Sequence, residues 1–252
     1  MKFRAPAFLD GVTTPVAGEA AFRNYAKGKI VVGVDEVGRG PLAGPVVACA
    51  AVLKAPDALL TLNDSKKLSR PKREAMFDSV KDACVCYAIA SASVEEIDTM
   101  NILEADFLAM RRALTALGMP GLDAPAPEIP VECRGSLAES AALFEAHSAC
   151  VDLFTPPAPD VLVAVDGNLK IHGVPEDMQI PVVKGDGLVA SISAASILAK
   201  VFRDRYMDAL EQKYPGYGFD KHAGYGTKFH LDAIRKLGFT PAHRKSFHPK
   251  GL

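Results

Sequence analysis

Five short apolar runs constrain the fold of this chain more than any other feature of its sequence. Each is four to nine residues long and rich in small and β-branched residues, which is the pattern of a strand buried on both faces. The runs are Ile30–Val34, Pro45–Leu53, Cys84–Ala90, Val161–Val165 and Ile180–Val183. Helical patterns lie between and after them. This order of strands and helices predicts an α/β domain with a mixed β-sheet flanked by helices and with a C-terminal helical region.

Three segments show the spacing and the end signals of helices. Asn101 is a suitable N-cap for Ile102–Leu117, where apolar residues recur at intervals of three and four. Ser69–Asp82 has a proline near its start, where a helix tolerates one. Leu188–Lys213 is rich in Ala and Ser. Such small residues predict a long helix that lies close against the sheet.

Prolines concentrate between Gly118 and Asp160, where seven of the 18 in the chain occur. That density opposes regular structure and predicts a surface insertion over about residues 118–160. Within the insertion, Ser136 and Glu139 have the spacing of a capping box, which predicts a short helix to about Cys150.

Positive charge is concentrated at the C-terminal end. The whole chain has a net charge of −1, yet the stretch from Lys200 to Leu252 holds 11 Lys and Arg against 5 Asp and Glu. Tyrosines and histidines are interspersed there: Tyr214, Tyr217, Tyr225, His222, His230, His243 and His248. This mixture suits either a solvated surface or a surface that follows nucleic-acid phosphates. The histidines lack the spacing of a zinc site, so they are expected at that surface.

We expect one domain over residues 1–252, with a core at 29–217 and a basic substrate-binding segment at 218–252.

The apolar stretches and the cysteines argue against several classes of protein. Gly187–Ala199, the longest uncharged apolar stretch, is too short to span a membrane, and the run Ala5–Leu9 is too short for a secretory signal. The five cysteines are odd in number and include no C-x-x-C pair, so neither a disulfide framework nor a cysteine zinc site is expected. These observations predict a cytoplasmic protein with no membrane partner.

Four acidic residues stand where predicted elements end. Asp35 and Glu36 directly follow the first strand. Asp166 follows the strand Val161–Val165, and Asp186 stands just before the long helix. Chain segments at the carboxyl ends of strands converge on one edge of an α/β sheet, so the four acids are expected to form a cluster. Turn formation alone would explain any one of them, but it explains all four less well.

A cluster of four carboxylates needs cations, because like charges packed together cannot all stay ionised. Oxygen ligands select Mg²⁺ or Mn²⁺, and two such ions about 4 Å apart can activate water and stabilise the leaving oxygen of a phosphodiester. The acids therefore predict a two-metal site for phosphoryl chemistry. Neighbouring side chains of a strand point to opposite faces, so Asp35 and Glu36 share the site only if the chain turns there. Gly38 and Gly40 favour such a turn.

Two alternative interpretations stay open at this point. Gly38–Ala43 matches the G-x-G-x-x-A pattern of a dinucleotide-binding loop, which would make the chain an oxidoreductase. That pattern needs a helix to follow, whereas the apolar run after the loop favours a strand. The second alternative is a protein that binds nucleic acid without cutting it. A polar turn would serve a nuclease and a non-cutting binder alike. Its residues Asn63, Ser65 and Lys66 offer amide, hydroxyl and ammonium donors to a phosphate.

The run from Gly33 to Ala48 resembles the opening signature of the bacterial ribonuclease HII family. Further segments match that family in the same order: Asn63–Ser69, Asn101–Leu103, Val165–Gly167, Lys184–Asp186, Ala194–Arg205, Gly224–Thr227 and His243–Phe247. The resemblance covers most of the chain from Lys29 to Pro249. The sister family, ribonuclease HIII, has an extra N-terminal domain and fits poorly, because only 29 residues precede the first strand.

This resemblance implies a ribonuclease H-like fold and an endonuclease that cuts on the 5′ side of ribonucleotides, in RNA/DNA hybrids and in duplex DNA, leaving 3′-OH and 5′-phosphate ends. The family's four metal ligands fall on Asp35, Glu36, Asp166 and Asp186. Its glycine–arginine–glycine loop, which reads the ribose 2′-OH through the backbone, falls on Gly38, Arg39 and Gly40, and its junction-sensing tyrosine falls on Tyr225.

Two departures from the family pattern limit what carries over. The insertion at 118–160 is longer and richer in proline than is usual. Ala223 replaces the usual lysine, so one contact to the nucleic-acid backbone is not carried over. The C-terminus shows no sliding-clamp motif. We expect a monomer whose partner is the nucleic acid, with no obligate protein partner.

Overall fold

The computed structural model describes residues 5–59, 69–145 and 159–248. At its centre is a six-stranded sheet with the order β4-β3-β2-β1-β5-β6. The strands are β1 (Ile30–Val37), β2 (Val46–Leu53), β3 (Cys84–Ala92), β4 (Glu132–Arg134), β5 (Val161–Asp166) and β6 (Gln179–Val182). The neighbours from β1 to β4 pair antiparallel, whereas β5 lies parallel to β1 and β6 parallel to β5. The predicted mixed sheet is confirmed, and each predicted strand is present.

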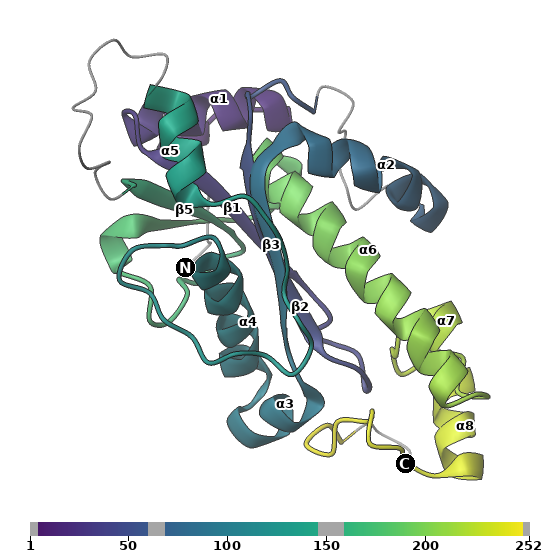
Figure 1. The fold of residues 1–252 in the computed structure, drawn as a ribbon. Coiled ribbons are helices and arrows are strands. Elements are labelled where there is room, and N and C mark those ends of the chain that lie inside the picture. Colours follow the sequence, from purple (N-terminus) through teal and green to yellow (C-terminus); the bar gives the residue numbers. More distant parts are fainter. Residues whose placement is uncertain (1–4, 60–68, 146–158, 249–252) are drawn as a thin grey trace.

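Helices cover both faces of this sheet (Figure 1). They are α1 (Pro15–Ala26), α2 (Arg70–Ala83), α3 (Val94–Met100), α4 (Ile102–Ala116), α5 (Leu137–Glu145), α6 (Ala190–Lys213), α7 (Phe219–His222) and α8 (Lys228–Leu237). α4 packs on one face and α6 on the other, where α1 and α2 flank it. Asn101 caps α4 as predicted, because its side chain accepts hydrogen bonds from the amides of Leu103 and Glu104.

One strand supplies side chains to both halves of the core. Ala48 and Ala50 of β2 belong to the apolar cluster under α4, whereas Cys49 and Ala51 belong to the cluster under α6. All residues of β2 are buried. This explains why its sequence is an unbroken apolar run and does not alternate between apolar and polar residues.

The long helix α6 lies very close to the sheet, as its small residues predict. A Cβ on Gly33 of β1 would lie only 2.2 Å from the backbone carbon of Ser191, so only glycine fits there. Glu19 of α1 is fully buried and accepts a hydrogen bond from the Ser191 amide at 3.0 Å. It thereby satisfies one of the amides that a helix N-terminus leaves without an internal partner.

The proline-rich insertion is more ordered than its composition predicts. Ser136 and Glu139 make both hydrogen bonds of the predicted capping box, each at 3.2 Å. Before them, β4 pairs with the edge of β3, and Leu137 is buried in the core cluster under α4. The short helix predicted to open at Ser136 is confirmed as α5, whereas the pairing of β4 and the burial of Leu137 are not what a surface insertion predicts; all seven prolines lie outside residues 132–145. The predicted helix end near Cys150 lies outside the described residues.

The C-terminal helical region is also confirmed. α7 and α8 pack against the far end of α6 through an apolar cluster that contains Met207, Phe219 and Ile234.

Across residues 5–59, 69–145 and 159–248, no helix has both the length and the apolar composition needed to cross a membrane.

Candidate active site

Two parallel neighbours in the sheet place Asp35 beside Asp166. The paired residues Val34 and Val165 immediately precede these acids in β1 and β5, so both carboxylates stand at one edge of the sheet. Both line a pocket of about 330 Å³. Asp35 is 4% exposed, and Ser196 of α6 lines the same pocket. The predicted convergence of these two acids is what the fold produces.

The first strand does not end before Asp35, contrary to prediction. β1 continues to Val37, because its ladder with β2 goes on after its pairing with β5 has ended. Glu36 nevertheless lines the same pocket as Asp35. Beyond Val34, β1 has no partner in β5, so side chains from either face of the strand can reach the space that opens there. The turn that we expected between the two acids is therefore not needed.

The fourth acid reaches the site from the turn before α6. Asp186 lies in the short 3₁₀ turn Gly185–Gly187, and its backbone amide donates a hydrogen bond to Asp166 Oδ1 at 3.3 Å. Gly185 approaches that carboxylate so closely that a Cβ there would lie 3.2 Å from Oδ1. Asp186 therefore lies next to Asp166 through its backbone, whereas the acids that line the pocket are Asp35, Glu36 and Asp166.

Burial and neighbouring like charges disfavour the ionised forms of Asp35 and Glu36. Burial, followed by the charges of Asp166 and Glu36, raises the pKa of Asp35 well above its usual value. Burial and Asp166 also raise the pKa of Glu36, and Arg39 opposes that rise. A divalent cation among these oxygens would relieve the repulsion, so the acids suit a hard metal ion. Within the described part of the chain, no three acidic, His or Cys side chains are already drawn together as a ligand set.

Two basic residues that sequence reasoning missed stand beside the acids. Arg73 of α2 and Lys200 of α6 line the same pocket. Both contact the buried carboxylate of Asp204, and the distance from Arg73 Nη2 to Asp204 Oδ2 is 3.3 Å. The only indication in the sequence was the spacing of Lys200 and Asp204, which places them on one face of a helix.

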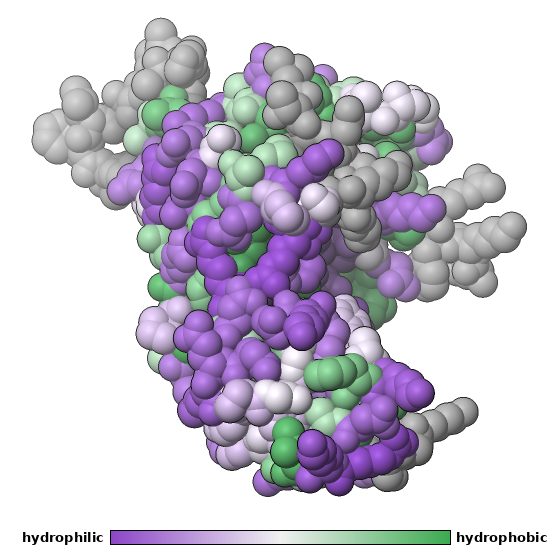
Figure 2. Space-filling model, turned by 90° about the vertical axis from the view of Figure 1, so that its right-hand side faces the viewer, coloured by the Kyte–Doolittle hydropathy of each residue, from purple (hydrophilic) through white to green (hydrophobic). Residues whose placement is uncertain are grey.

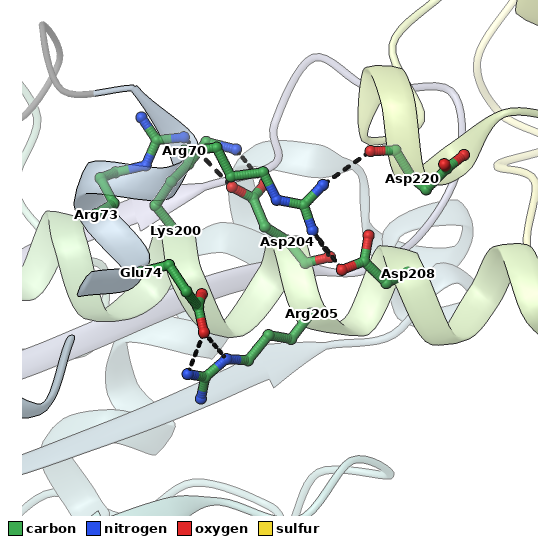
Figure 3. A network of polar contacts seen from close by, with 8 residues as sticks. All are labelled: Arg70, Arg73, Glu74, Lys200, Asp204, Arg205, Asp208 and Asp220. Carbon is green, nitrogen blue, oxygen red and sulfur yellow. Dashed lines mark hydrogen bonds and ion pairs between the residues drawn. The ribbon is translucent and has the colours of Figure 1, made fainter. Parts of the chain in front are cut away.

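Figure 3 shows the polar network that surrounds this pair. Arg70 contacts Asp208 and donates a hydrogen bond to the backbone carbonyl of Asp220 at 2.8 Å, and Glu74 contacts Arg205. These contacts join α2 to α6 and α7. They hold α2 in place as one wall of the acidic pocket.

Two buried arginines, Arg203 and Arg244, pack against the Gly38–Gly40 loop. Arg244 donates hydrogen bonds to the carbonyl oxygens of Gly38 and Arg39, at 2.6 and 2.9 Å. Gly38 has a φ of 100°, and a Cβ there would lie 2.3 Å from Nε of Arg203, so only glycine fits. Arg203 itself donates to the carbonyl of Pro45 at 3.0 Å. Both arginines lie in charged sequence runs that resemble a solvated surface, so sequence reasoning passed over them.

Tyr225 stands next to this loop and is 47% exposed. A Cβ on Gly40 would lie 3.4 Å from Cε1 of the Tyr225 ring, and Tyr225 also lines the acidic pocket. The ring is therefore near both the glycine loop and the carboxylates. By contrast, Tyr217 is a core residue, and its hydroxyl donates to the carbonyl of Gly238 at 2.7 Å.

The C-terminal histidines are not the surface residues that we expected, with the exception of His248. His230 and His243 are buried against one another, and the His222 ring stacks on that of His230 at 4.7 Å. Aromatic packing around Phe219 provides the apolar surroundings that enclose them.

Asn63, Ser65 and Lys66 lie outside the described residues. Ala223 has a φ of 48°, and its carbonyl accepts a hydrogen bond from Arg203 Nη1 at 3.0 Å.

An acidic sheet edge of this kind, under a long helix and beside an exposed tyrosine, defines a nuclease of the ribonuclease H-like class. The sequence profile described as Ribonuclease HII matches residues 32–124 and 163–250, and its interruption covers most of the proline-rich insertion. The chain belongs to the ribonuclease HII family. It is an endonuclease that hydrolyses RNA in RNA/DNA hybrids.

Individual relatives agree with this assignment. The chain is 43% identical to ribonuclease HII of Delftia acidovorans over 93% of its length and 83% of the relative, and 45% identical to that of Nitrosomonas europaea over 89% and 86%. Among solved structures, the ribonuclease H2 of Pyrococcus horikoshii has a TM-score of 0.58 at 25% identity, over 86% of this chain and 93% of that one. Ribonuclease HII of Archaeoglobus fulgidus, solved in complex with PCNA, has a TM-score of 0.57 at 20% identity, over 88% and 97%, and shows the same fold.

The oxidoreductase alternative is not supported. The Gly38–Ala43 loop leads into β2 and not into a helix, so it lacks the helix N-terminus on which a dinucleotide pyrophosphate would rest. The family assignment likewise disfavours a protein that binds nucleic acid without cutting it.

Proposed function

We propose that the enzyme holds two divalent cations, Mg²⁺ or Mn²⁺, with Asp35, Glu36, Asp166 and Asp186. Such cations would activate a water and stabilise the leaving oxygen of a phosphodiester. The support comes from the pKa values of Asp35 and Glu36, which burial and then the neighbouring carboxylates raise, since bound cations would offset both effects. The chain's own part is to place the four carboxylates on rigid elements at one sheet edge.

The bond that we expect to be cut lies on the 5′ side of a ribonucleotide, either in an RNA/DNA hybrid or embedded in duplex DNA, and leaves 3′-OH and 5′-phosphate ends. One observation carries this proposal: the Tyr225 ring lies against Gly40 at the mouth of the acidic pocket. A sugar at that point contacts both elements at once. The backbone of Gly38, Arg39 and Gly40 hydrogen-bonds its 2′-OH, while the Tyr225 ring packs against the sugar.

Positive charge around the pocket supplies contacts to phosphates. Arg73 and Lys200 are next to the carboxylates, and we assign them to the phosphate at the cleavage site. Figure 2 shows that the side of the molecule on which α2 and α6 lie is largely hydrophilic. We propose that the basic segment 218–252 follows the nucleic-acid backbone there, with further phosphate contacts from Asn63, Ser65 and Lys66.

The setting of this activity follows from the substrate. We propose that residues 1–252 act as a single catalytic domain with its core at 29–217, as a monomer and in the cytoplasm, where chromosomal DNA and its hybrids are found. The interruption of the family profile between residues 124 and 163 supports an insertion outside the shared catalytic core.

A cleavage assay tests the proposal. A 5′-labelled duplex with one embedded ribonucleotide is incubated with the enzyme, with and without Mg²⁺ or Mn²⁺, and the product ends are mapped. We expect a single cut on the 5′ side of the ribonucleotide, a 3′-OH end, and no product when the metal is chelated. An all-DNA duplex of the same sequence is the control and should stay intact.

Three results would contradict the proposal. Cutting on the 3′ side would overturn the placement of the sugar between Tyr225 and Gly40. Cutting in the presence of a chelator would overturn the role of the four acids. Cleavage of a continuous hybrid, with none of the single-ribonucleotide duplex, would limit the enzyme to long RNA stretches.

A further inference from the structure

Two buried histidines face each other between α8 and the C-terminal segment. His230 of α8 is fully buried and His243 is 1% exposed, and their Nε2 atoms are 3.1 Å apart. They lie outside the acidic pocket, and the mechanism proposed above does not use them. A direct ring-to-ring hydrogen bond needs one donor and one acceptor, so the two rings must carry their protons on different atoms.

The surrounding backbone determines which atoms carry the protons. The amide of Thr240 donates to Nδ1 of His243 at 2.9 Å, so this Nδ1 is an acceptor and the proton of His243 is on Nε2. That Nε2–H donates to Nε2 of His230. The proton of His230 is consequently on Nδ1, which lies 3.0 Å from the carbonyl oxygen of Tyr225 and donates to it. Every ring nitrogen of the pair is satisfied when both histidines are neutral.

The protein environment keeps the pair neutral. Burial and the neighbouring His230 lower the pKa of His243 to about 4, and burial also lowers the pKa of His230. His222 on α7 disfavours a second positive charge at His230, whereas Glu211 on α6 favours one. Burial is the largest of these effects, so both histidines are neutral at neutral pH. The series of hydrogen bonds from Thr240 through the two rings to Tyr225 therefore stays intact.

Arg244, the residue after His243, contacts the Gly38–Gly40 loop, which is the other part of the proposed sugar site. The Arg244 side chain donates to the carbonyls of Gly38 and Arg39, and its backbone amide donates to the carbonyl of Leu42 at 2.8 Å. Two consecutive residues therefore hold both parts of the proposed sugar site. His243 supports Tyr225 through His230, and Arg244 supports the glycine loop directly.

We propose that His230 and His243 are positioning residues that hold the Tyr225 ring at a fixed distance from the Gly38–Gly40 loop, and so determine how well the enzyme recognises a single ribonucleotide. The proposal rests on the function proposed for Tyr225. Neither histidine touches the substrate in this scheme. Their effect passes through the Tyr225 carbonyl, which anchors the backbone that carries the ring.

Substitution of His230 by two different amides separates this role from simple packing. Asn carries its amide where Nδ1 of histidine lies, so His230→Asn keeps a donor to Tyr225. Gln carries its amide where Nε2 of histidine lies, so His230→Gln keeps a partner for His243 but loses the bond to Tyr225. We expect kcat/KM on a single-ribonucleotide duplex to fall about fivefold to tenfold in His230→Gln, and clearly less in His230→Asn. Mn²⁺ affinity, measured by calorimetry without substrate, should equal that of the wild type in both.

A double-mutant cycle with Tyr225→Ala shows whether the effect acts through the ring. If it does, adding His230→Gln to Tyr225→Ala causes little further loss. Full additivity, or equal loss in His230→Asn and His230→Gln, overturns the positioning role. A Tyr225→Ala variant with wild-type activity overturns instead the function proposed for Tyr225, so the two failures are distinguishable.

The wild-type protein offers a measurement that needs no variant. ¹⁵N spectra of the imidazole rings at pH 7 report which nitrogen carries the proton. We expect His230 to be protonated on Nδ1 and His243 on Nε2, and both to be neutral. A charged His243, or one protonated on Nδ1, contradicts the arrangement even if every variant fails to fold.

Discussion

The carboxylate of Asp106 is buried beneath Arg39, with Oδ2 at 3.6 Å from Nε of the arginine. Asp106 belongs to α4 and is 1% exposed, and neither of its oxygens accepts a hydrogen bond. The same guanidinium lies 3.7 Å from Glu36. One partly exposed arginine thus stands between a buried acid and a proposed metal ligand. Burial and the charge of Glu36 raise the pKa of Asp106 well above its usual value, and Arg39 opposes this only in part.

We predict that Asp106→Asn stabilises the metal-free protein at pH 8 by about 1 kcal/mol, because it removes a buried charge that Arg39 compensates only in part. The folded protein holds a proton on Asp106 more tightly than the unfolded chain does, so the ionised form costs stability as the pH rises above the unfolded value. The gain in melting temperature should therefore shrink between pH 8 and pH 5. A loss of stability that is larger at pH 8 would instead identify the Arg39 ion pair as net favourable.

We predict that Asp35→Asn and Asp166→Asn abolish cleavage while the protein stays folded. Each change removes a charge that a cation needs, and each also relieves repulsion in the metal-free site, so the melting temperature without metal should not fall. Single-turnover cleavage and thermal melting in a chelator are the two measurements. Asp177→Asn, which removes an exposed acid far from the pocket lining, is the matched control and should cut normally. Near-normal turnover in either site variant would remove the assignment of metal ligands.

We predict that stability falls as the pH drops below about 6.5, through the buried histidines. The pKa of His243 is about 4 in the folded protein and close to 6.5 in an unfolded chain, so the unfolded chain binds more protons in that window. The contribution is complete above pH 6.5 and is progressively lost toward pH 4. Melting curves across this range should be flatter for His243→Gln than for the wild type. His248→Gln, which removes an exposed histidine outside this buried cluster, is the matched control.

We predict that Tyr225→Ala lowers cleavage of a single-ribonucleotide duplex by roughly tenfold to a hundredfold, since one aromatic stack contributes about 1 to 3 kcal/mol. The exposed ring contributes little to the core, so the melting temperature should stay near that of the wild type. Tyr225→Phe should recover most of the activity, apart from any contact of the hydroxyl. A sharp drop in melting temperature in Tyr225→Ala, with recovery in Tyr225→Phe, would show that the ring serves packing and not recognition.

The acidic site could be predicted from the sequence because each acid borders an apolar run, and such runs form the strands whose ends meet. Asp35 and Asp166 follow directly from that rule. The length of β1 could not be predicted, because hydrogen bonding to β2 carries the strand three residues past Val34, its last residue paired with β5, to Val37. Arg203 and Arg244 were missed for a related reason. A buried arginine is recognisable only when the carbonyl oxygens that enclose it are known, and these come from distant segments of the chain.

The last prediction concerns the insertion, where composition alone is misleading. Leu137 is fully buried in the cluster under α4, and its amide donates to the carbonyl of Leu117 at 2.8 Å. We predict that Leu137→Ala lowers the free energy of unfolding by about 2 to 4 kcal/mol, as in other buried leucine sites. Leu169→Ala, at a leucine that is 43% exposed, should change it by less than about 1 kcal/mol. Denaturant titrations of both variants are the measurement. Equal, small effects would mean that α5 is a dispensable surface element, as the proline content first suggested, and a large loss only in Leu137→Ala would place it in the core.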